Sequence, residues 1–256
     1  MKSAGERRGS GMRVVYGLNP VRELLRAAAG EVSELWLAEG GTRGAAFAEL
    51  ERLARAAGAK VRAAPRPKLD RLATTDRHQG VVAVVSEFRY AAVEDLLARA
   101  AQSGRPPLVV LLDGVEDPHN LGAIVRSAHA LGAHGVVIPK DRAVGVTPAA
   151  AKASAGAVER SLVARVTNVA QCIGALKKAG VWSVALASDG DRPLSSLDLR
   201  GPTALVLGGE GEGLRPLVRK SCDFSAHIPM KGEIDSLSVS ASAAVALYEA
   251  ARQRAG

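Results

Sequence analysis

An apolar run in the middle of the chain is followed by polar residues that could bind a ligand. Asp113 ends the run LVVLLD, Asn120 follows a polar turn, and Arg126 comes six residues later. We expect a strand that ends at the turn and a helix whose N-cap is Asn120, with Arg126 inside the helix among apolar neighbours. An arginine there is costly to bury unless it meets an anion. Arg126 therefore binds an anionic ligand, or it forms a structural pair with Asp113 or Asp117.

A cluster of glycines follows a second apolar run. The segment LVLGGEGEGL, residues 205–214, places four glycines directly after a predicted strand. Glycines let the backbone approach a ligand closely, and ligands of open α/β sheets bind outside the carboxyl ends of the strands. The segment is neither G-x-G-x-x-G nor a Walker A loop, because no Gly-Lys-Ser/Thr follows. The composition fits a ligand-binding loop and a generic flexible turn equally well.

A third segment, IPMKGEIDSLSVSAS at residues 228–242, leads from a strand through a loop into a helix rich in Ala and Ser. Small side chains on that helix allow close packing against a neighbour. Ser236 and Ser238 could make polar contacts with a ligand, or either could be the N-cap of the helix. We expect the capping role for one of the two.

These segments need a framework that brings them together, and the second half of the chain predicts one. Apolar runs alternate with helical patterns from Leu108 onward. Strands that are apolar throughout and alternate with helices predict a parallel sheet covered on both faces. The expected strands are 108–113, 135–139, 162–166, 181–186, 203–209 and 226–230, and the expected helices start at 120 or cover 148–155, 169–179, 214–221 and 237–252.

The first half of the chain predicts a smaller α/β domain over residues 12–88. We expect its strands at 32–38, 60–64 and 80–86, and its helices at 45–57, at 67–73 and from Asn19-Pro20 to Gly30. In the last of these, Asn19 is the expected N-cap and Pro20 the first helical residue. Residues 1–11 are expected to be a flexible tail. Residues 89–107, with one amphipathic helix at 93–101 and then SGRPP, are expected to be a linker to a second domain at 108–256.

Composition limits the classes of partner. The chain has 34 Lys and Arg against 26 Asp and Glu, net +8, and residues 1–106 hold 18 basic and 12 acidic side chains, net +6. This excess suits contacts with nucleic-acid phosphates, although a solvated surface explains it equally well. With 3 Phe, 2 Trp and 3 Tyr, the chain has few aromatic rings on which to stack single-stranded bases.

No apolar run reaches the roughly 18 residues of a membrane-spanning helix, and the N-terminus has no apolar signal-peptide region. We therefore expect no membrane association. Cys172 and Cys222 have no metal-binding spacing, which excludes a disulfide framework and a cysteine-built zinc site. We expect no metal, and a reducing cytoplasm as the compartment.

Together the three segments resemble, in order and spacing, the motifs of the SpoU (TrmH) family of RNA ribose 2′-O-methyltransferases. Residues 13–88, with VVYGLNPVREL and HQGVVAVV, resemble that family's N-terminal substrate-binding domain. The resemblance implies an α/β fold of SPOUT type, a parallel sheet with a C-terminal trefoil knot, preceded by a small α/β substrate-binding domain. It implies a homodimer with active sites at the subunit interface and S-adenosylmethionine as the cofactor. The two-domain form is most similar to the subgroup that methylates a guanosine ribose in bacterial 23S rRNA.

The resemblance also implies roles for individual residues. Catalytic roles fall to Asn120, Arg126, Glu210, Ser236 and the position of Ser238. At that last position the family has asparagine, and the shorter hydroxyl offers fewer hydrogen bonds, so we expect an active enzyme with an altered contact there. The residues implied to line the cofactor pocket are Leu207, Gly208, Gly209, Gly211, Ile228, Pro229, Met230 and Leu237.

The implied reaction moves a methyl group from a sulfonium to a ribose 2′-oxygen, which must lose its proton, so a base is needed. The family account gives that role to Arg126, although a guanidinium stays protonated at ordinary pH. Arg126 could equally hold the adjacent phosphate and so position the 2′-oxygen. Sequence does not decide between the two.

The basic first domain is the expected RNA-docking module. His78 could hydrogen-bond a nucleotide or hold a turn, and the candidate phosphate contacts are Arg62, Arg66, Lys68, Arg71 and Arg77. Two alternatives remain: the same chemistry on tRNA or on an rRNA site that confers antibiotic resistance, and a non-catalytic RNA-binding or ribosome-assembly protein. The presence of Asn120, Arg126, Glu210 and the glycine loop argues against the non-catalytic alternative.

Overall fold

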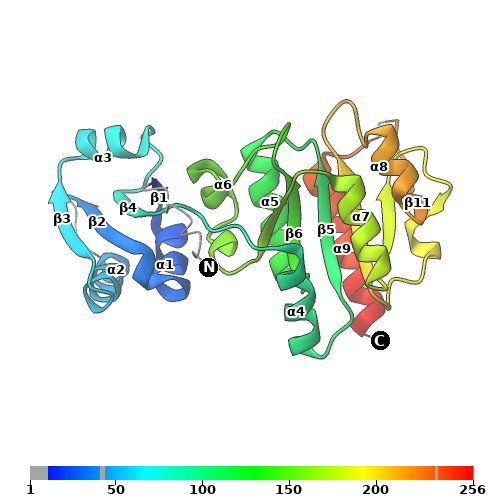
Figure 1. Ribbon diagram of the computed structural model, residues 1–256. Coiled ribbons are helices and arrows are strands. Elements are labelled where there is room, and N and C mark those ends of the chain that lie inside the picture. The colour runs from blue at the N-terminus through cyan, green and yellow to red at the C-terminus, as the bar shows by residue number, and fades with distance from the viewer. Residues whose placement is uncertain (1–10, 41–43, 234–235, 256) are drawn as a thin grey trace, which may run out of the picture. The chain divides into compact units, whose positions relative to one another are not determined.

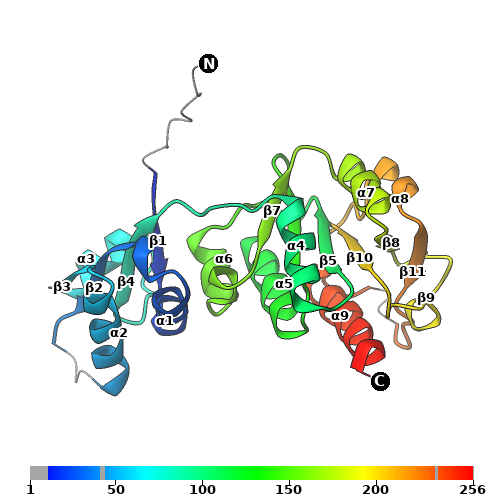
Figure 2. The same ribbon diagram turned by 60° about the horizontal axis from the view of Figure 1, so that its bottom comes forward.

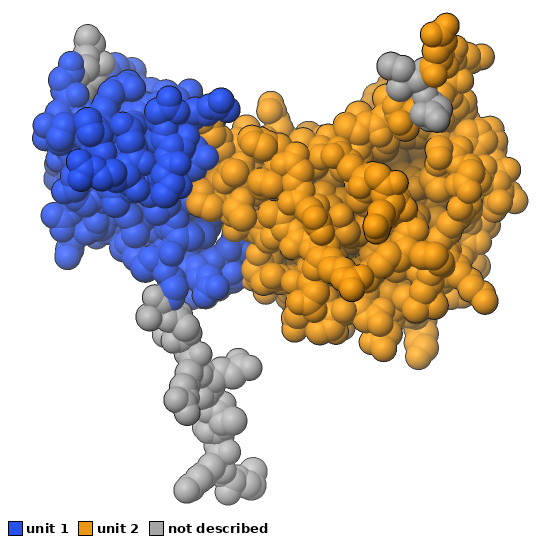
Figure 3. Space-filling model, turned by 90° about the horizontal axis from the view of Figure 1, so that it is seen from above, with its two compact units in different colours: residues 1–89 blue, residues 90–256 orange. Residues whose placement is uncertain are grey.

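The computed structural model describes residues 11–40, 44–233 and 236–255. The chain divides into two compact units, one up to Arg89 and one from Tyr90, which Figure 3 colours separately. The tail expected at residues 1–11 lies, apart from Gly11, outside the described residues.

The first unit is a four-stranded mixed sheet with helices on both faces (Figure 1). Its strand order is β1-β4-β2-β3, with β4 antiparallel to β1 and β2, and β2 parallel to β3. Helices α1 and α2 cover one face with an aliphatic core, and α3 covers the other around Trp36 and Leu69. The elements are β1 (Met12–Tyr16), α1 (Leu18–Ala27), η1 (Ala29–Glu31), β2 (Val32–Ala38), α2 (Ala45–Ala56), β3 (Lys60–Ala64), α3 (Arg66–Ala73) and β4 (Val81–Ser86).

Two features of this unit depend on contacts that are distant in sequence. Strand β1 was not predicted, and it forms by pairing with β4 about 70 residues later. Helix α1 begins at Leu18, so the expected N-cap at Asn19 is wrong. The first N–H of the helix, that of Leu18, donates to Oε1 of Gln79 at 3.1 Å. The residue before the helix, Gly17, has φ 98°, a backbone conformation that favours glycine. Rules that consider only neighbouring residues cannot find such a cap.

The second unit is a seven-stranded sheet in which every strand pair is parallel, as the sequence predicts. Its strand order is β7-β6-β5-β10-β8-β11-β9. The strands are β5 (Leu108–Asp113), β6 (Gly135–Pro139), β7 (Val163–Val166), β8 (Trp182–Leu186), β9 (Arg192–Pro193), β10 (Thr203–Gly208) and β11 (Phe224–His227). The last strand ends three residues earlier than expected, so Ile228, Pro229 and Met230 lie in a loop.

Helices cover both faces of this sheet (Figure 2). Helices α4, α7 and α8 share one core, whereas α9 packs on α5 and β10 at the other face, where α6 also contacts α5. The helices are α4 (Val93–Ser103), α5 (Pro118–Ala130), α6 (Pro148–Ala153), η2 (Ala157–Glu159), α7 (Val169–Lys178), η3 (Leu194–Ser196), α8 (Pro216–Ser221) and α9 (Val239–Ala255). Helix α4, which lies in the expected linker, belongs to this unit because Leu96 and Ala100 are fully buried in it.

The strand order reverses between β5 and β10. The chain runs outward from β5 through β6 to β7, and then crosses back to build β8, β10 and β11 on the other side. In open parallel sheets this reversal opens a crevice at the carboxyl ends of the strands, where ligands bind. Strand β11 lies beyond β8, yet α9 packs on β10 and α5. The chain between β11 and α9 therefore returns across the carboxyl ends of β8 and β10.

Candidate functional site

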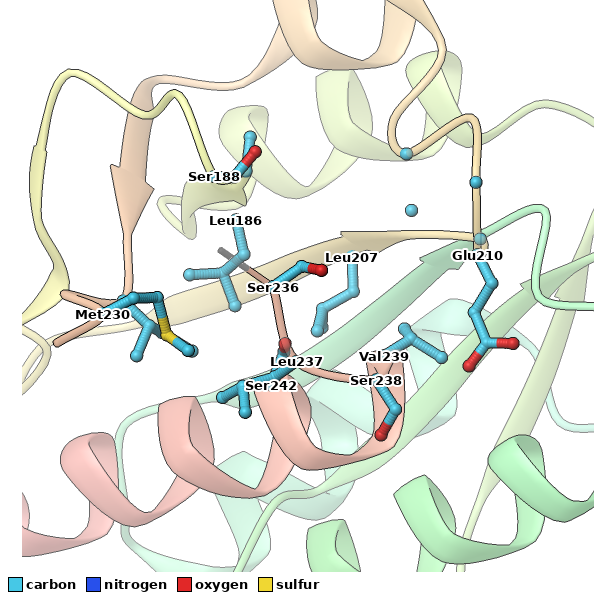
Figure 4. Close-up of a pocket in the computed structure, with 16 residues that line it drawn as sticks. Leu186, Ser188, Leu207, Glu210, Met230, Ser236, Leu237, Ser238, Val239 and Ser242 are labelled. Carbon is cyan, nitrogen blue, oxygen red and sulfur yellow. The ribbon is translucent and has the colours of Figure 1, made fainter. Parts of the chain in front are cut away.

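A cavity of about 500 Å³ lies at the carboxyl ends of β8, β10 and β11. Figure 4 shows Met230 and Glu210 at opposite ends of its lining, with Leu207, Ser236 and Leu237 between them. All of the residues implied for a cofactor pocket line it except Pro229, which is exposed. One wall of this cavity, formed by Leu186, Ala187 and Ser188 after β8, was not predicted from the sequence. Its position at the carboxyl end of a predicted strand could have indicated it, because ligands of open α/β sheets bind at such ends.

The glycine loop after β10 is a closely packed turn rather than a flexible one. Gly209 N–H donates to Asp113 O at 2.8 Å, and Gly213 N–H donates to Gly209 O at 3.1 Å. A Cβ at Gly208 would lie 2.0 Å from the carbonyl carbon of Gly213, and one at Gly209 would lie 2.1 Å from Gly114 O. Only glycine permits such backbone approaches. The loop therefore presents Glu210 from a fixed position.

A second cavity of about 480 Å³ lies between the carboxyl ends of β5 and β10. It shares Gly209, Glu210, Gly213 and Val239 with the first cavity, and Asn120 lines its wall. Glu210 thus borders both cavities. A small molecule in the first cavity and a second reactant in the other would meet at this residue.

A hydrogen-bond chain links the three sequence segments at this point. Asn120 Nδ2 donates to Glu210 Oε1 at 2.8 Å, and Ser240 Oγ donates to Asn120 Oδ1 at 2.7 Å. The Ser238 and Ser240 hydroxyls lie 3.2 Å apart. Sequence reasoning did not single out Ser240, because its partner is 120 positions away. The chain fixes both ends of the Asn120 carboxamide and orients the Glu210 carboxylate.

Asn120 is free to make these bonds because it is not the helix cap. Helix α5 begins at Pro118, and the Asp117 side chain caps it by accepting the His119 N–H at 2.9 Å. The expected N-cap at Asn120 is therefore wrong. The reason is Pro118, which favours the first helical position and leaves the preceding residue as the cap.

Ser236 and Ser238 both line the first cavity, and one of them is the predicted cap. Ser238 Oγ accepts the Ala241 N–H at 3.3 Å, and Ser238 O accepts the Ser242 N–H at 2.9 Å. Ser238 is therefore the N-cap of α9. Asparagine is an equally good N-cap, so the serine that departs from the family pattern keeps this helix start.

The buried carboxylate of Asp113 forms an ion pair with Arg215, whose side chain is half-exposed. Its carboxylate accepts the backbone N–H of Arg215 at 3.0 Å and the Nε–H at 2.8 Å, and the side-chain bond raises the pKa of the Arg215 guanidinium. Asp113 is 1% exposed, whereas the Arg215 side chain is 46% exposed, so the pair joins a buried carboxylate to a guanidinium that solvent still reaches. The pair anchors the end of the glycine loop to β5.

Arg126 lies on the expected helix, but its surroundings differ from the expectation. Its side chain is exposed on α5 rather than among apolar neighbours, and it lines neither cavity. Asp113 is bound to Arg215 and Asp117 caps the helix, so the expected structural pair does not form. Within residues 11–40, 44–233 and 236–255, no hydrogen-bond or ion-pair partner contacts the guanidinium. Arg126 therefore remains available to an anion from outside its own chain.

The basic residues singled out in the first unit surround α3. Arg66, Lys68 and Arg71 are exposed on that helix, and Arg77 is exposed in the turn before β4. Arg62 on β3 bonds to Glu34, and both Arg62 and Lys68 lie over the Trp36 ring, at 5.3 Å and 4.3 Å from its centre. Arg62 and Lys68 therefore share one site at the Trp36 ring, with Arg62 partly neutralised by its carboxylate partner.

His78 is fully buried, with both ring nitrogens in use. Its Nδ1 accepts the Gly80 N–H at 2.9 Å, so Nε2 carries the proton and donates to Asp70 Oδ1 at 2.8 Å. Of the two roles that the sequence left open, the structure shows His78 holding the turn before β4.

The described residues contain neither a membrane-spanning helix nor a cluster of metal-binding side chains. Within residues 11–40, 44–233 and 236–255, no helix is long and apolar enough to cross a membrane. The same residues contain no group of three His, Cys, Asp or Glu side chains arranged to hold a metal ion.

Comparisons with known proteins match both units. Residues 107–248 match the model of the SpoU rRNA Methylase family, and residues 14–91 match the model for RNA 2′-O ribose methyltransferase substrate binding. The chain is similar to the 23S rRNA (guanosine-2′-O-)-methyltransferase RlmB of Xanthomonas campestris pv. campestris, with 47% identity over 94% of this chain and 97% of that protein. It is similar to the protein of the same name from Coxiella burnetii, with 41% identity over 96% of this chain and 97% of that protein.

A crystal structure with the same fold is that of the SpoU methyltransferase AviRb from Streptomyces viridochromogenes, solved in complex with the cofactor AdoMet. The two structures superpose with a TM-score of 0.81 at 30% sequence identity, covering 96% of this chain and 91% of that chain. The similarity therefore extends over both units rather than over one motif.

Proposed function

The chain belongs to the SpoU rRNA methylase family, and we propose that it transfers a methyl group from S-adenosylmethionine to a ribose 2′-hydroxyl of a guanosine in bacterial 23S rRNA. The observation that carries this proposal is the meeting of two cavities at Glu210, one suited to the cofactor and one open to a second reactant. The relatives named for 23S rRNA, similar over nearly their whole length, favour that RNA.

The first cavity fits the cofactor. Its size of about 500 Å³ is in the range of small-molecule sites, and its walls combine apolar side chains with backbone of the glycine loop. Leu207, Ile228 and Leu237 would contact the apolar faces of the adenine, while backbone N–H and C=O groups near Gly209 and Gly211 would bind its polar edge. When bound there, S-adenosylmethionine supplies an electrophilic methyl group.

The side chains between the cavities orient the acceptor. Glu210 and Asn120, held by the hydrogen-bond chain from Ser240, are the groups that an entering ribose meets first. Fixed polar groups lower a barrier by holding the reacting atoms in line. Ser236, at the wall of the first cavity, would bind the cofactor or the ribose. We propose that Glu210, Asn120 and Ser236 position the reactants through polar contacts.

Arg126 completes the site from a partner subunit. It is exposed, lines neither cavity of its own chain, and lies on α5, which packs against α9. Helix α9 exposes Val245 by 41% and Tyr248 by 61%, and these apolar groups suit an interface between two copies. In a homodimer Arg126 would reach the partner's second cavity and bind the RNA next to the 2′-oxygen. Its charge would stabilise the negative charge that develops on the 2′-oxygen as that oxygen gives up its proton to solvent water.

We also propose that the chain is knotted in its C-terminal part. The chain between β11 and α9 returns across the carboxyl ends of β8 and β10, and the loops that follow those strands line the same cavity as Ile228 and Ser236. Such a return across loops that already project from the sheet suits a trefoil knot. The exposed cations on and next to α3 support RNA docking by residues 12–88. A ribosomal RNA substrate is consistent with a cytoplasmic reaction.

The direct test incubates the full-length protein with methyl-labelled S-adenosylmethionine and unmodified transcripts of 23S rRNA and of tRNA. Label should enter 23S rRNA at one guanosine, and that position should resist alkaline cleavage because its 2′-oxygen is blocked. Glu210→Gln is the matched control, which keeps the side-chain size and removes the charge. If only the tRNA transcript becomes labelled, the substrate is tRNA rather than 23S rRNA. Cofactor binding without transfer to either RNA would favour the non-catalytic RNA-binding alternative.

A further inference from the structure

The second cavity has an acidic wall, which is unfavourable for an RNA strand. Among the described residues that line it, the carboxylates are Asp113, Glu116, Asp117, Glu210 and Glu212, and the guanidiniums are Arg142 and Arg215. Arg215 is engaged by Asp113. Like charges repel strongly where water is partly excluded, so a phosphate entering this cavity needs a cation to offset the carboxylates.

Arg142 is the lining cation without such a partner in the part of the chain that the structure describes. Its side chain is exposed, and no carboxylate contacts it. Its backbone has φ 54°, a left-handed conformation that is uncommon for a residue with a Cβ. Backbone strain of this kind is often found at functional sites, where the surrounding structure holds it in place.

The loop that carries Arg142 is fastened at several points. Val144 N–H donates to Val115 O at 3.0 Å, and Val146 N–H donates to the Tyr90 hydroxyl at 2.9 Å. Arg165 lies 4.8 Å from the centre of the Tyr90 ring and donates to Lys140 O at 3.3 Å. These contacts hold residues 140–146 against the turn after β5, so Arg142 is presented at the cavity.

The geometry points to Arg142 as a substrate-positioning residue that binds a phosphate of the RNA strand beside the acceptor ribose. This inference rests on the proposed function, because it places the RNA in the second cavity. A guanidinium matches the fork geometry of phosphate oxygens and keeps its charge at any ordinary pH. It would draw the strand past the carboxylates and place the ribose at Glu210.

The test compares full-length wild type with Arg142→Gln, Arg142→Lys, Arg142→Gly and Lys178→Gln. Lys178 is the matched control, since it is an exposed cation at the end of α7 that lines neither cavity. Binding of unmodified 23S rRNA transcript is measured across a salt series, together with methyl-transfer kinetics and calorimetric binding of S-adenosylmethionine. The transcript is the probe in both RNA measurements.

Arg142→Gln should weaken RNA binding and raise KM for RNA by about tenfold, the loss of roughly one charge-assisted contact. The salt slope should fall by about 0.7, the value for one phosphate contact to a single strand. Cofactor binding should be unchanged, Arg142→Lys should restore the slope, and Lys178→Gln should match wild type. Arg142→Gly, which accepts the left-handed backbone, should keep the thermal midpoint and still lose RNA affinity.

The inference is overturned if Arg142→Gln has the same RNA affinity and salt slope as Lys178→Gln. It is also overturned if the variant loses cofactor binding and thermal stability and Arg142→Lys restores neither, since the role would then be structural. If wild type binds the transcript but transfers no methyl group, the proposed function fails, and the salt slopes still decide the role of Arg142.

Discussion

The Ser240 hydroxyl donates to Asn120 Oδ1 at 2.7 Å, and this bond leaves the Asn120 amide nitrogen facing Glu210 Oε1 at 2.8 Å. Without the hydroxyl, the carboxamide could rotate and place its oxygen against the carboxylate. Ser240 therefore acts on the site through Asn120 rather than on the reactants.

We expect Ser240→Ala to lower kcat about three- to tenfold, which corresponds to one neutral hydrogen bond of about 0.5–1.5 kcal/mol. Calorimetric affinity for S-adenosylmethionine should be unchanged. Ser240→Thr keeps the hydroxyl and should recover most of the rate. Equal rates for Ser240→Ala and wild type would show that Asn120 is held by other contacts.

Ser238 tests the cap of α9. Ser238→Ala should lower the free energy of unfolding by about 0.5–2 kcal/mol, because the Ala241 N–H loses its acceptor. Ser238→Asn restores an efficient cap and should leave stability within a few tenths of a kcal/mol of wild type. Urea denaturation measures both changes. A larger loss in Ser238→Asn than in Ser238→Ala would mean that the cavity wall has no room for the carboxamide.

Gly209→Ala tests the glycine loop. The new Cβ would lie 2.1 Å from Gly114 O, so the loop must shift and carry Glu210 with it. We expect a loss of about 1–3 kcal/mol in stability and a strong fall in kcat. Gly174→Ala is the control, because a Cβ there meets nothing within 4 Å and α7 should gain about 0.5–1 kcal/mol. Normal activity in Gly209→Ala would contradict the close packing at this turn.

Arg126 can be tested with mixed dimers. Arg126→Ala and Glu210→Gln chains, each of which we expect to be inactive alone, are co-expressed with different tags, and the mixed dimers are purified through both tags. If Arg126 serves the partner's cavity, each mixed dimer has one site with both residues intact, and about half of the wild-type activity should return. If Arg126 serves its own chain, both sites lack one residue and no activity returns.

Much of the fold follows from local sequence patterns. Strands 32–38, 60–64 and 108–113 match their expected limits, because each is an apolar or alternating run between turn residues. The helix starts were less predictable. The α5 cap could have been found, since Pro118 marks Asp117, but the α1 cap could not, because Gln79 supplies it from 61 residues away.

In the candidate site, too, local sequence patterns predict some residues, whereas others depend on contacts between distant parts of the chain. The glycine loop and Leu207, Ile228 and Leu237 follow strands at the carboxyl edge, so strand prediction alone brings them close. Ser240 and Arg142 became visible only with the strand order and the packing of α9 on α5, which depend on contacts between distant residues. Arg126 was placed on the right helix, but its exposed face depends on how α5 packs.

The return of the chain from β11 to α9 has a consequence for synthesis on the ribosome. Ser236, Leu237 and Val239, which close the first cavity, are translated after the strands and the glycine loop that form its other walls. A nascent chain that already displays the basic first unit has no completed cavity. If the first unit docks RNA as proposed, an emerging chain would contact RNA before its cofactor cavity is complete, and a chain stopped between the first unit and α9 would bind RNA without methylating it.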